Sequence, residues 1–306
     1  MSNPRLPVLV AIVAAAGLLA AACGDDGATP VSTGSADPDV AILEVGHEGG
    51  FTTPEVLYTQ MPELVVYADG RVVTSGAQAM VHPAPALPPL FESQLTDDGL
   101  ATLQSAIADA GLDTHGVDYG QPPVADAGQT VVQIRVNGET YEHRAEALGI
   151  AGPPGGLGDP GEGPDEGSGG APGESGLTAE QREARAGLQT FVDEVTDLGA
   201  LVGPEELGEE TPVDIERFRL WVRPADELGQ LLDPPEGEPA PDEVEWTVDG
   251  VDLEASECLA VEGDAASRLA ELLADADQLA RFVDGDQEFS VVARPVLAHE
   301  DTCPST

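Results

Sequence analysis

Lysine is absent from this sequence, and arginine supplies all 12 basic side chains. Against them stand 57 acidic residues, so the formal net charge is -45. Such a chain repels the phosphates of nucleic acids and of anionic lipid headgroups. Charge therefore excludes nucleic acid as a partner. We interpret the acidity as a means of solubility rather than as a sign of calcium binding.

The motifs of several enzyme classes are also missing. The sequence has neither a Gly-x-Ser-x-Gly elbow nor a Ser-x-x-Lys pair, which excludes two classes of serine hydrolase. His47 precedes Glu48 but has no second histidine four positions later, as a zinc-binding helix would require. We interpret His47 as a loop residue and the other histidines as surface residues without metal-ligand spacing: His82, His115, His143 and His299. The sequence thus predicts no catalytic, cofactor or metal residue.

Long apolar runs are scarce, and the one at the N-terminus has the layout of a secretory signal. Arg5 precedes an alanine-rich run over residues 6–22 that is shorter than a strongly apolar membrane span. Leu19-Ala20-Ala21-Ala22-Cys23 resembles the bacterial lipobox, which predicts a signal peptide at 1–22 and a lipid on Cys23. The alternative is cleavage after an A-x-A pattern, which would leave a free thiol.

Cysteine is rare, and only Cys258 and Cys303 remain after Cys23. An even count in an oxidising compartment favours one disulfide between them. The alternative is two separate buried thiols.

Changes in composition divide the chain into regions. We expect a flexible lipoprotein tether at 23–40, an N-terminal α+β region at 41–150, and a disordered insert rich in glycine, proline and acidic residues at 151–176. A helix at 177–203 and a C-terminal α+β region with the disulfide at 204–306 complete the chain. The predicted fold class is α+β, with antiparallel hairpins, helices packed on one face, and two small subdomains as an option.

Turn and cap residues place the elements. Asp69-Gly70 and Asn137-Gly138 each separate two β-rich runs, which predicts two-residue hairpins whose turn residues both have positive φ. Thr96 begins a predicted helix that ends at Asp109, and Thr178 has capping-box spacing to Gln181.

The apolar pattern of the C-terminal region predicts further strands and a helix. We expect strands at 217–222, 258–261 and 289–293, and a helix that is capped by Asp264 and carries apolar residues as far as Val283.

One cluster of basic residues stands out. Arg217, Arg219 and Arg223 fall on one side of the predicted strand, opposite Phe218, Leu220 and Val222. They either neutralise nearby carboxylates or form a patch for an anionic ligand or a partner.

Several segments are similar to a group of secreted or lipid-anchored actinobacterial proteins. They are Glu63–Arg71, Ala86–Leu90, Val124–Ala127, Ala147–Gly149, and the end from Cys258 through Ala293-Arg294-Pro295 to Cys303. The resemblance spans most of residues 41–303. It implies the location and the disulfide, and it carries over no catalytic residue.

These observations predict an extracytoplasmic protein, anchored to the cell membrane by a lipid on Cys23, that acts without enzymatic activity as a binding or structural module. Its expected partners are the membrane, through the lipid, and an unknown component of the envelope. The alternative is an envelope hydrolase that uses paired carboxylates. A transporter's solute receptor would need longer alternating strand and helix units forming two lobes.

Overall fold

The computed structural model describes residues 37–78, 81–150, 176–225, 240–254 and 258–303. The predicted signal peptide, Cys23, most of the predicted tether and nearly all of the predicted insert lie outside the described residues. Within the described part, antiparallel strands and packed helices confirm the α+β fold class.

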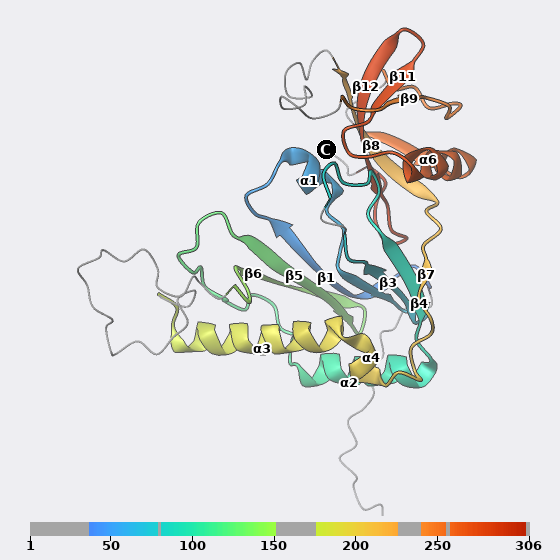
Figure 1. Cartoon of the computed structure of the whole chain (residues 1–306). Coiled ribbons are helices and arrows are strands. Elements are labelled where there is room, and N and C mark those ends of the chain that lie inside the picture. The colour runs from blue at the N-terminus through green and yellow to red at the C-terminus, as the bar shows by residue number, and fades with distance from the viewer. Residues whose placement is uncertain (1–36, 79–80, 151–175, 226–239, 255–257, 304–306) are drawn as a thin grey trace, which may run out of the picture.

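A seven-stranded sheet forms the larger layer, with the order β6-β5-β1-β2-β3-β4-β7 (Figure 1). All of its neighbouring strands are antiparallel. The strands are β1 (Ala41–Gly49), β2 (Leu64–Tyr67), β3 (Arg71–Ser75), β4 (Leu90–Gln94), β5 (Gly128–Val136), β6 (Glu139–Glu146) and β7 (Thr211–Pro212).

The two predicted hairpins form with different turns. Asn137 and Gly138 have φ of 53° and 84°, as a two-residue type I′ turn requires, which confirms that prediction. The loop between β2 and β3 has one residue more than the predicted two-residue turn. Gly70 donates to the carbonyl of Tyr67 at 3.0 Å, and only Gly70 in this loop has positive φ. The expectation of positive φ at Asp69 was therefore wrong. A type I turn followed by a left-handed glycine joins these strands.

Three helices cover one face of this sheet: α2 (Asp97–Asp109), α3 (Ala179–Thr196) and α4 (Leu198–Val202). Thr96 caps α2, and the capping box of Thr178 and Gln181 is present. The helix expected at 177–203 is interrupted at Asp197, whose carboxylate caps α4 by accepting from the amide of Ala200 at 3.3 Å. The main core lies between these helices and the sheet, and its fully buried members include Leu43, Leu103, Ile134, Leu188 and Val195.

A second, five-stranded sheet has the order β10-β8-β12-β11-β9. It contains β8 (Arg217–Pro224), β9 (Glu243–Glu245), β10 (Leu259–Glu262), β11 (Arg281–Asp284) and β12 (Gln287–Pro295), and only β9 and β11 pair in parallel. Its own core, with Phe218, Leu269, Leu273, Phe282 and Phe289, lies against α6 (Asp264–Ala274). The helix expected to reach Val283 ends at Ala274, because Val283 belongs to the hairpin strand β11. The expected cap at Asp264 was also wrong, since Gly263 holds the N-cap position and Asp264 is the first helical residue.

Each of the two sheets is contacted by segments from the other part of the chain. Strand β7 follows the predicted boundary at residue 204, yet it pairs with β4 in the first sheet. Conversely, Ala84 and Ala86 precede β4 but bond to the backbone beside α6, where Ala86 donates to Ala276 and Gln278 donates to Ala84. The short helix α1 (Pro54–Thr59) lies against β12. Residue 204 therefore does not separate the two sheets.

The C-terminal segment completes this exchange. Leu297 packs on the face of the first sheet opposite the helices, with Val65, Tyr67, Val73 and Leu90. The predicted disulfide between Cys258 and Cys303 is present, with a Cα–Cα distance of 6.1 Å. It ties the end of the described chain to the residue before β10.

Candidate functional site

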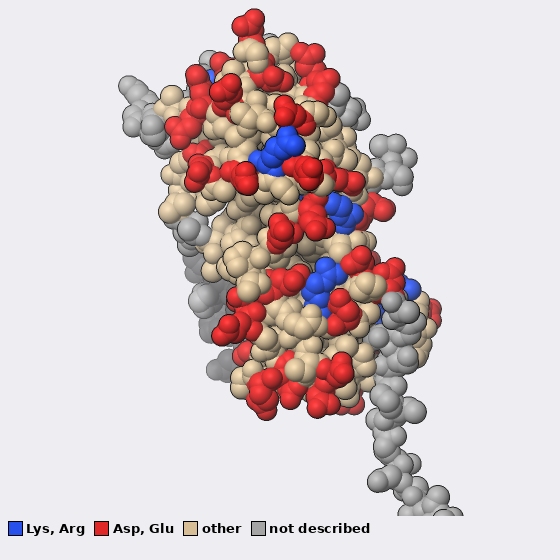
Figure 2. Space-filling view, turned by 90° about the vertical axis from the view of Figure 1, so that its right-hand side faces the viewer, with Lys and Arg blue, Asp and Glu red and all other residues tan. Residues whose placement is uncertain are grey.

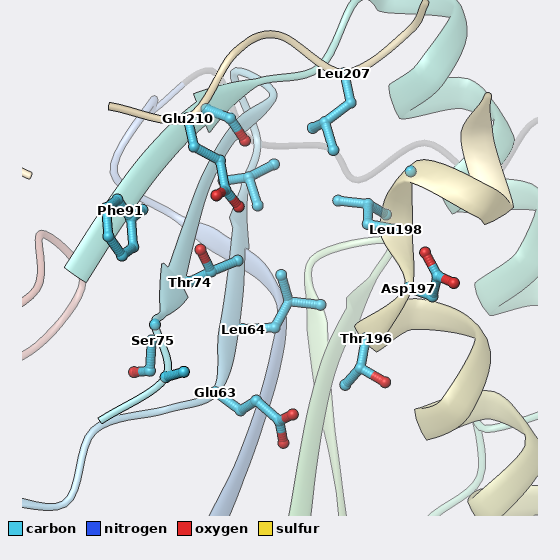
Figure 3. A pocket seen from close by; sticks show the side chains of 15 residues that line it. Glu63, Leu64, Thr74, Ser75, Phe91, Thr196, Asp197, Leu198, Leu207 and Glu210 are labelled. Carbon is cyan, nitrogen blue, oxygen red and sulfur yellow. The ribbon is translucent and has the colours of Figure 1, made fainter. Parts of the chain in front are cut away.

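A groove of ≈ 440 Å³ lies between strands β2 to β4 of the first sheet and the junction of α3 and α4 (Figure 3). The break at Asp197 positions one wall, because it turns the chain from α3 into α4. The segment that leads to β7 forms another wall through Leu207 and Glu210. Two parts of the chain that are distant in the sequence, residues 63–93 and 196–210, thus meet at this groove.

The floor of the groove is apolar. Leu64, Val72 and Leu198 are buried there, and the ring of Phe91 lies at one side. The ring needs the absence of a side chain at Gly76, since a Cβ there would lie 2.4 Å from Cε2 of Phe91. Gly76 therefore fixes where the aromatic wall of the groove can stand.

Two hydroxyls in the groove have no internal partner. Ser93 is only 7% exposed, and neither it nor Thr74 makes a side-chain hydrogen bond to any residue that the structure describes. The strand register puts both on the face that carries Val72, because Ser93 pairs with Val72 and Thr74 lies two positions along β3. Neither oxygen is among the fully buried, unpartnered atoms of the described residues, so both can meet water or a polar ligand in the groove.

Three carboxylates line the groove: two stand at its ends, and the third, Asp197, lies at the junction of α3 and α4. Figure 3 shows Glu63 at one end and Glu210 at the other, with Thr74 between them. The imidazole of His47 lies 3.3 Å from Glu63, and this hydrogen bond lowers the pKa of Glu63 and raises that of His47. No basic side chain lines the groove among the described residues.

The acidity of the wider surface is not gathered at this site. On the face drawn in Figure 2, acidic side chains are spread over the molecule, with a few arginines among them. The groove therefore differs from its surroundings by its apolar floor and its unpartnered hydroxyls, rather than by charge alone.

The predicted arginine patch lies elsewhere, on the face of β8 that meets α1 and the C-terminal segment. Arg223 pairs with Glu55 of α1 at 2.6 Å, and Arg217 donates to the carbonyls of Leu297 and Glu300. Arg219 lies over the ring of Tyr58 at 5.2 Å. The regular pairing of β8 with β12 keeps the three arginines at alternating positions on one side of the strand. The contacts of Arg223 and Arg217 support the interpretation that the patch serves neighbouring groups of the chain itself, and its role in binding a ligand stays a prediction.

Three histidines are placed differently from the expectation. His47 belongs to β1 rather than to a loop. His143 is 1% exposed and lies between the hydroxyl of Tyr119 and the carbonyl of Leu112, each at 2.7 Å. The surface interpretation of His143 was wrong, because β6 turns this side chain toward a pocket where both ring nitrogens find partners.

His299 is likewise half-buried by long-range packing. Its ring bridges the hydroxyl of Tyr67 at 3.0 Å and the carboxylate of Glu44 at 2.9 Å. Burial raises the pKa of Tyr67 to about 12. Only the path of the C-terminal segment over β1 and β2 brings these three residues together, and no local pattern marks it.

Comparisons with known proteins identify no relative. No family model, no curated protein and no solved structure matches this chain. In the described ranges, no three histidine, cysteine or carboxylate side chains group as a metal site. No helix among the described residues combines the length and apolarity of a membrane span.

Proposed function

We propose that this protein is a binding module of the bacterial cell envelope, held outside the membrane by a lipid on Cys23, and that its ligand occupies the groove between β2–β4 and the α3–α4 junction. The observation that carries the binding role is the pair of unpartnered hydroxyls, Ser93 and Thr74, above an apolar floor. Mostly apolar concavities with a few converging polar groups are the usual form of a ligand site.

The location has separate support. The lipobox-like sequence before Cys23 favours export and lipidation. The disulfide between Cys258 and Cys303 is typical of an oxidising compartment outside the cytoplasm.

The groove favours binding over hydrolysis by paired carboxylates. A glycosidase needs one carboxylic acid whose pKa is raised, so that it stays protonated and can donate. The hydrogen bond from His47 lowers the pKa of Glu63 instead. Glu63 is therefore suited to hold a positive charge rather than to donate a proton.

Expression in a bacterium that processes lipoproteins tests the anchor, with intact mass and detergent-phase partitioning as readouts. We expect the wild-type protein to lose residues 1–22, to gain acyl mass and to enter the detergent phase, whereas Cys23→Ser stays aqueous. The matched control replaces Cys258 and Cys303 with serine and keeps Cys23, so it should still partition into detergent. A soluble wild-type protein without acyl mass would overturn the proposed anchor.

A further inference from the structure

We propose that the groove binds a short aliphatic diamine, with one ammonium group at Glu63, the other at Glu210, and the methylene chain over the apolar floor. This inference rests on the proposed binding function and names the ligand class for the same site. Both ends of the groove carry a carboxylate, and Asp197 adds a third at the α3–α4 junction. No described basic side chain lines the groove, and His47, which contacts Glu63, lies outside the lining. The charge of the site is therefore complementary to a dication.

The two hydroxyls can accept hydrogen bonds from a donor ligand. Ser93 and Thr74 have free lone pairs that face the groove, and an ammonium group brings three N–H donors and no acceptor. A ligand of this kind satisfies both the carboxylates and the hydroxyls, whereas an anion would meet repulsion at both ends. Ser93 as a residue is only 7% exposed, so its hydroxyl meets solvent only where the residue borders the groove.

The apolar floor accounts for the middle of the ligand. Leu64, Val72 and Leu198 present a surface that a hydrated metal ion cannot use but that methylene groups can cover. The face of the Phe91 ring attracts organic cations as well. One divalent metal ion could not bind both carboxylates, because they stand at opposite ends of the groove.

The span of the groove indicates the length of the ligand. Glu63 immediately precedes β2 and Glu210 immediately precedes β7, and these strands are three spacings apart, roughly 14 Å. The register also offsets the two residues by three positions along the strands, roughly 10 Å, so their backbones are roughly 17 Å apart. The carboxylate side chains shorten this gap from both sides. A chain of about four methylene groups, with an ammonium–carboxylate contact at each end, is of the right order to fill what remains.

Calorimetric titration of the folded Cys23→Ser protein with putrescine tests the inference, at about 0.15 M salt so that diffuse attraction to the acidic surface is screened. Butylamine, which has one ammonium group, and butanediol, which has none, are the matched probes. We expect putrescine to bind about tenfold or more tightly than butylamine, and butanediol not to bind.

Variants locate the site. Glu210→Gln should weaken putrescine binding about five- to tenfold and reduce the preference over butylamine, whereas its neighbour Glu209→Gln, which does not line the groove, should leave binding unchanged. Gly76→Ala, which must displace Phe91, should weaken both amines. Because Glu210 is exposed, its substitution leaves the fold intact, and circular dichroism checks this for each variant.

Two outcomes would overturn the inference. One is equal affinity for putrescine and butylamine. The other is an equal loss in Glu210→Gln and Glu209→Gln, which would show attraction to the surface in general. Neither outcome affects the acylation and partitioning of the wild-type protein, so failure of the ligand class is distinguishable from failure of the proposed anchoring.

Discussion

The carboxylate of Glu300 accepts two hydrogen bonds from the guanidinium of Arg294, at 2.7 and 2.8 Å. Glu300 also accepts from the amide of Leu297, and Arg294 donates through Nε to the carbonyl of Gln60. The side chain of Arg294 is 6% exposed and that of Glu300 is 20% exposed. The pair thus joins β12, the C-terminal segment and the chain after α1.

Removal of the carboxylate should destabilise the whole fold. Glu300→Gln leaves the buried guanidinium of Arg294 without its counter-charge, so we expect the free energy of unfolding to fall by roughly 2–4 kcal/mol. Urea denaturation of the wild-type protein and the variant measures this difference in the free energy of unfolding. The matched control is Asp249→Asn, whose carboxylate pairs with Arg268 but is 91% exposed and should change stability by less than about 0.5 kcal/mol. Equal effects of the two substitutions would contradict the assigned role of the buried pair.

The same pair should give stability a specific pH dependence. Burial alone would raise the pKa of Glu300, but the hydrogen bonds and charge of Arg294 outweigh it, so the folded pKa is lowered from its ordinary value. The contribution of this group is therefore complete above about pH 5 and is lost as the pH falls through the folded pKa.

Subtraction of the Glu300→Gln curve from the wild-type curve isolates this effect, because the other acidic residues titrate in both proteins. We expect the difference in unfolding free energy to be constant near neutral pH and to shrink below about pH 4.5. A difference that stays constant through the acid range would show that the folded pKa of Glu300 is not depressed.

Loss of the disulfide should also lower stability. It closes a loop with a sequence separation of 45 residues, for which the chain-entropy model gives about 4 kcal/mol. Denaturation of the Cys258→Ser, Cys303→Ser double variant against the wild-type protein measures the loss. Addition of a reductant should reproduce this loss in the wild-type protein and have no effect on the double variant. A reductant effect of similar size in both proteins would exclude the disulfide as its source.

Local sequence patterns predicted most of the individual elements. The Asn137-Gly138 turn, the Thr96 cap and the Thr178–Gln181 capping box depend on residues within a few positions of one another, so their physics is visible in a short window. The extra residue in the turn at Gly70 was missed because the length of the loop depends on which residues of β2 and β3 pair. In the structure Leu64 pairs with Thr74.

Features that depend on distant pairing were not predictable in this way. Nothing near Thr211 indicates that β7 will join β4, and nothing near His299 indicates Tyr67 and Glu44 as partners. The groove was missed for the same reason, since Ser93, Thr196 and Glu210 meet only after the sheet and helices assemble. The one local feature of the sequence that relates to the groove is Asp197, a residue type that favours helix N-caps. It caps α4 at the junction with α3, which forms one wall of the groove.

The position of β1 also determines how the protein bears mechanical load. The described chain enters the fold at Asp37 and passes directly into β1, which is hydrogen-bonded to β2 on one side and to β5 on the other. A pulling force directed along this strand acts across hydrogen bonds that run perpendicular to it, so both ladders rupture in shear together. An edge strand such as β7 would instead peel away one bond at a time. If the protein is held from its N-terminal side, the load therefore enters the fold through an interior strand of the larger sheet.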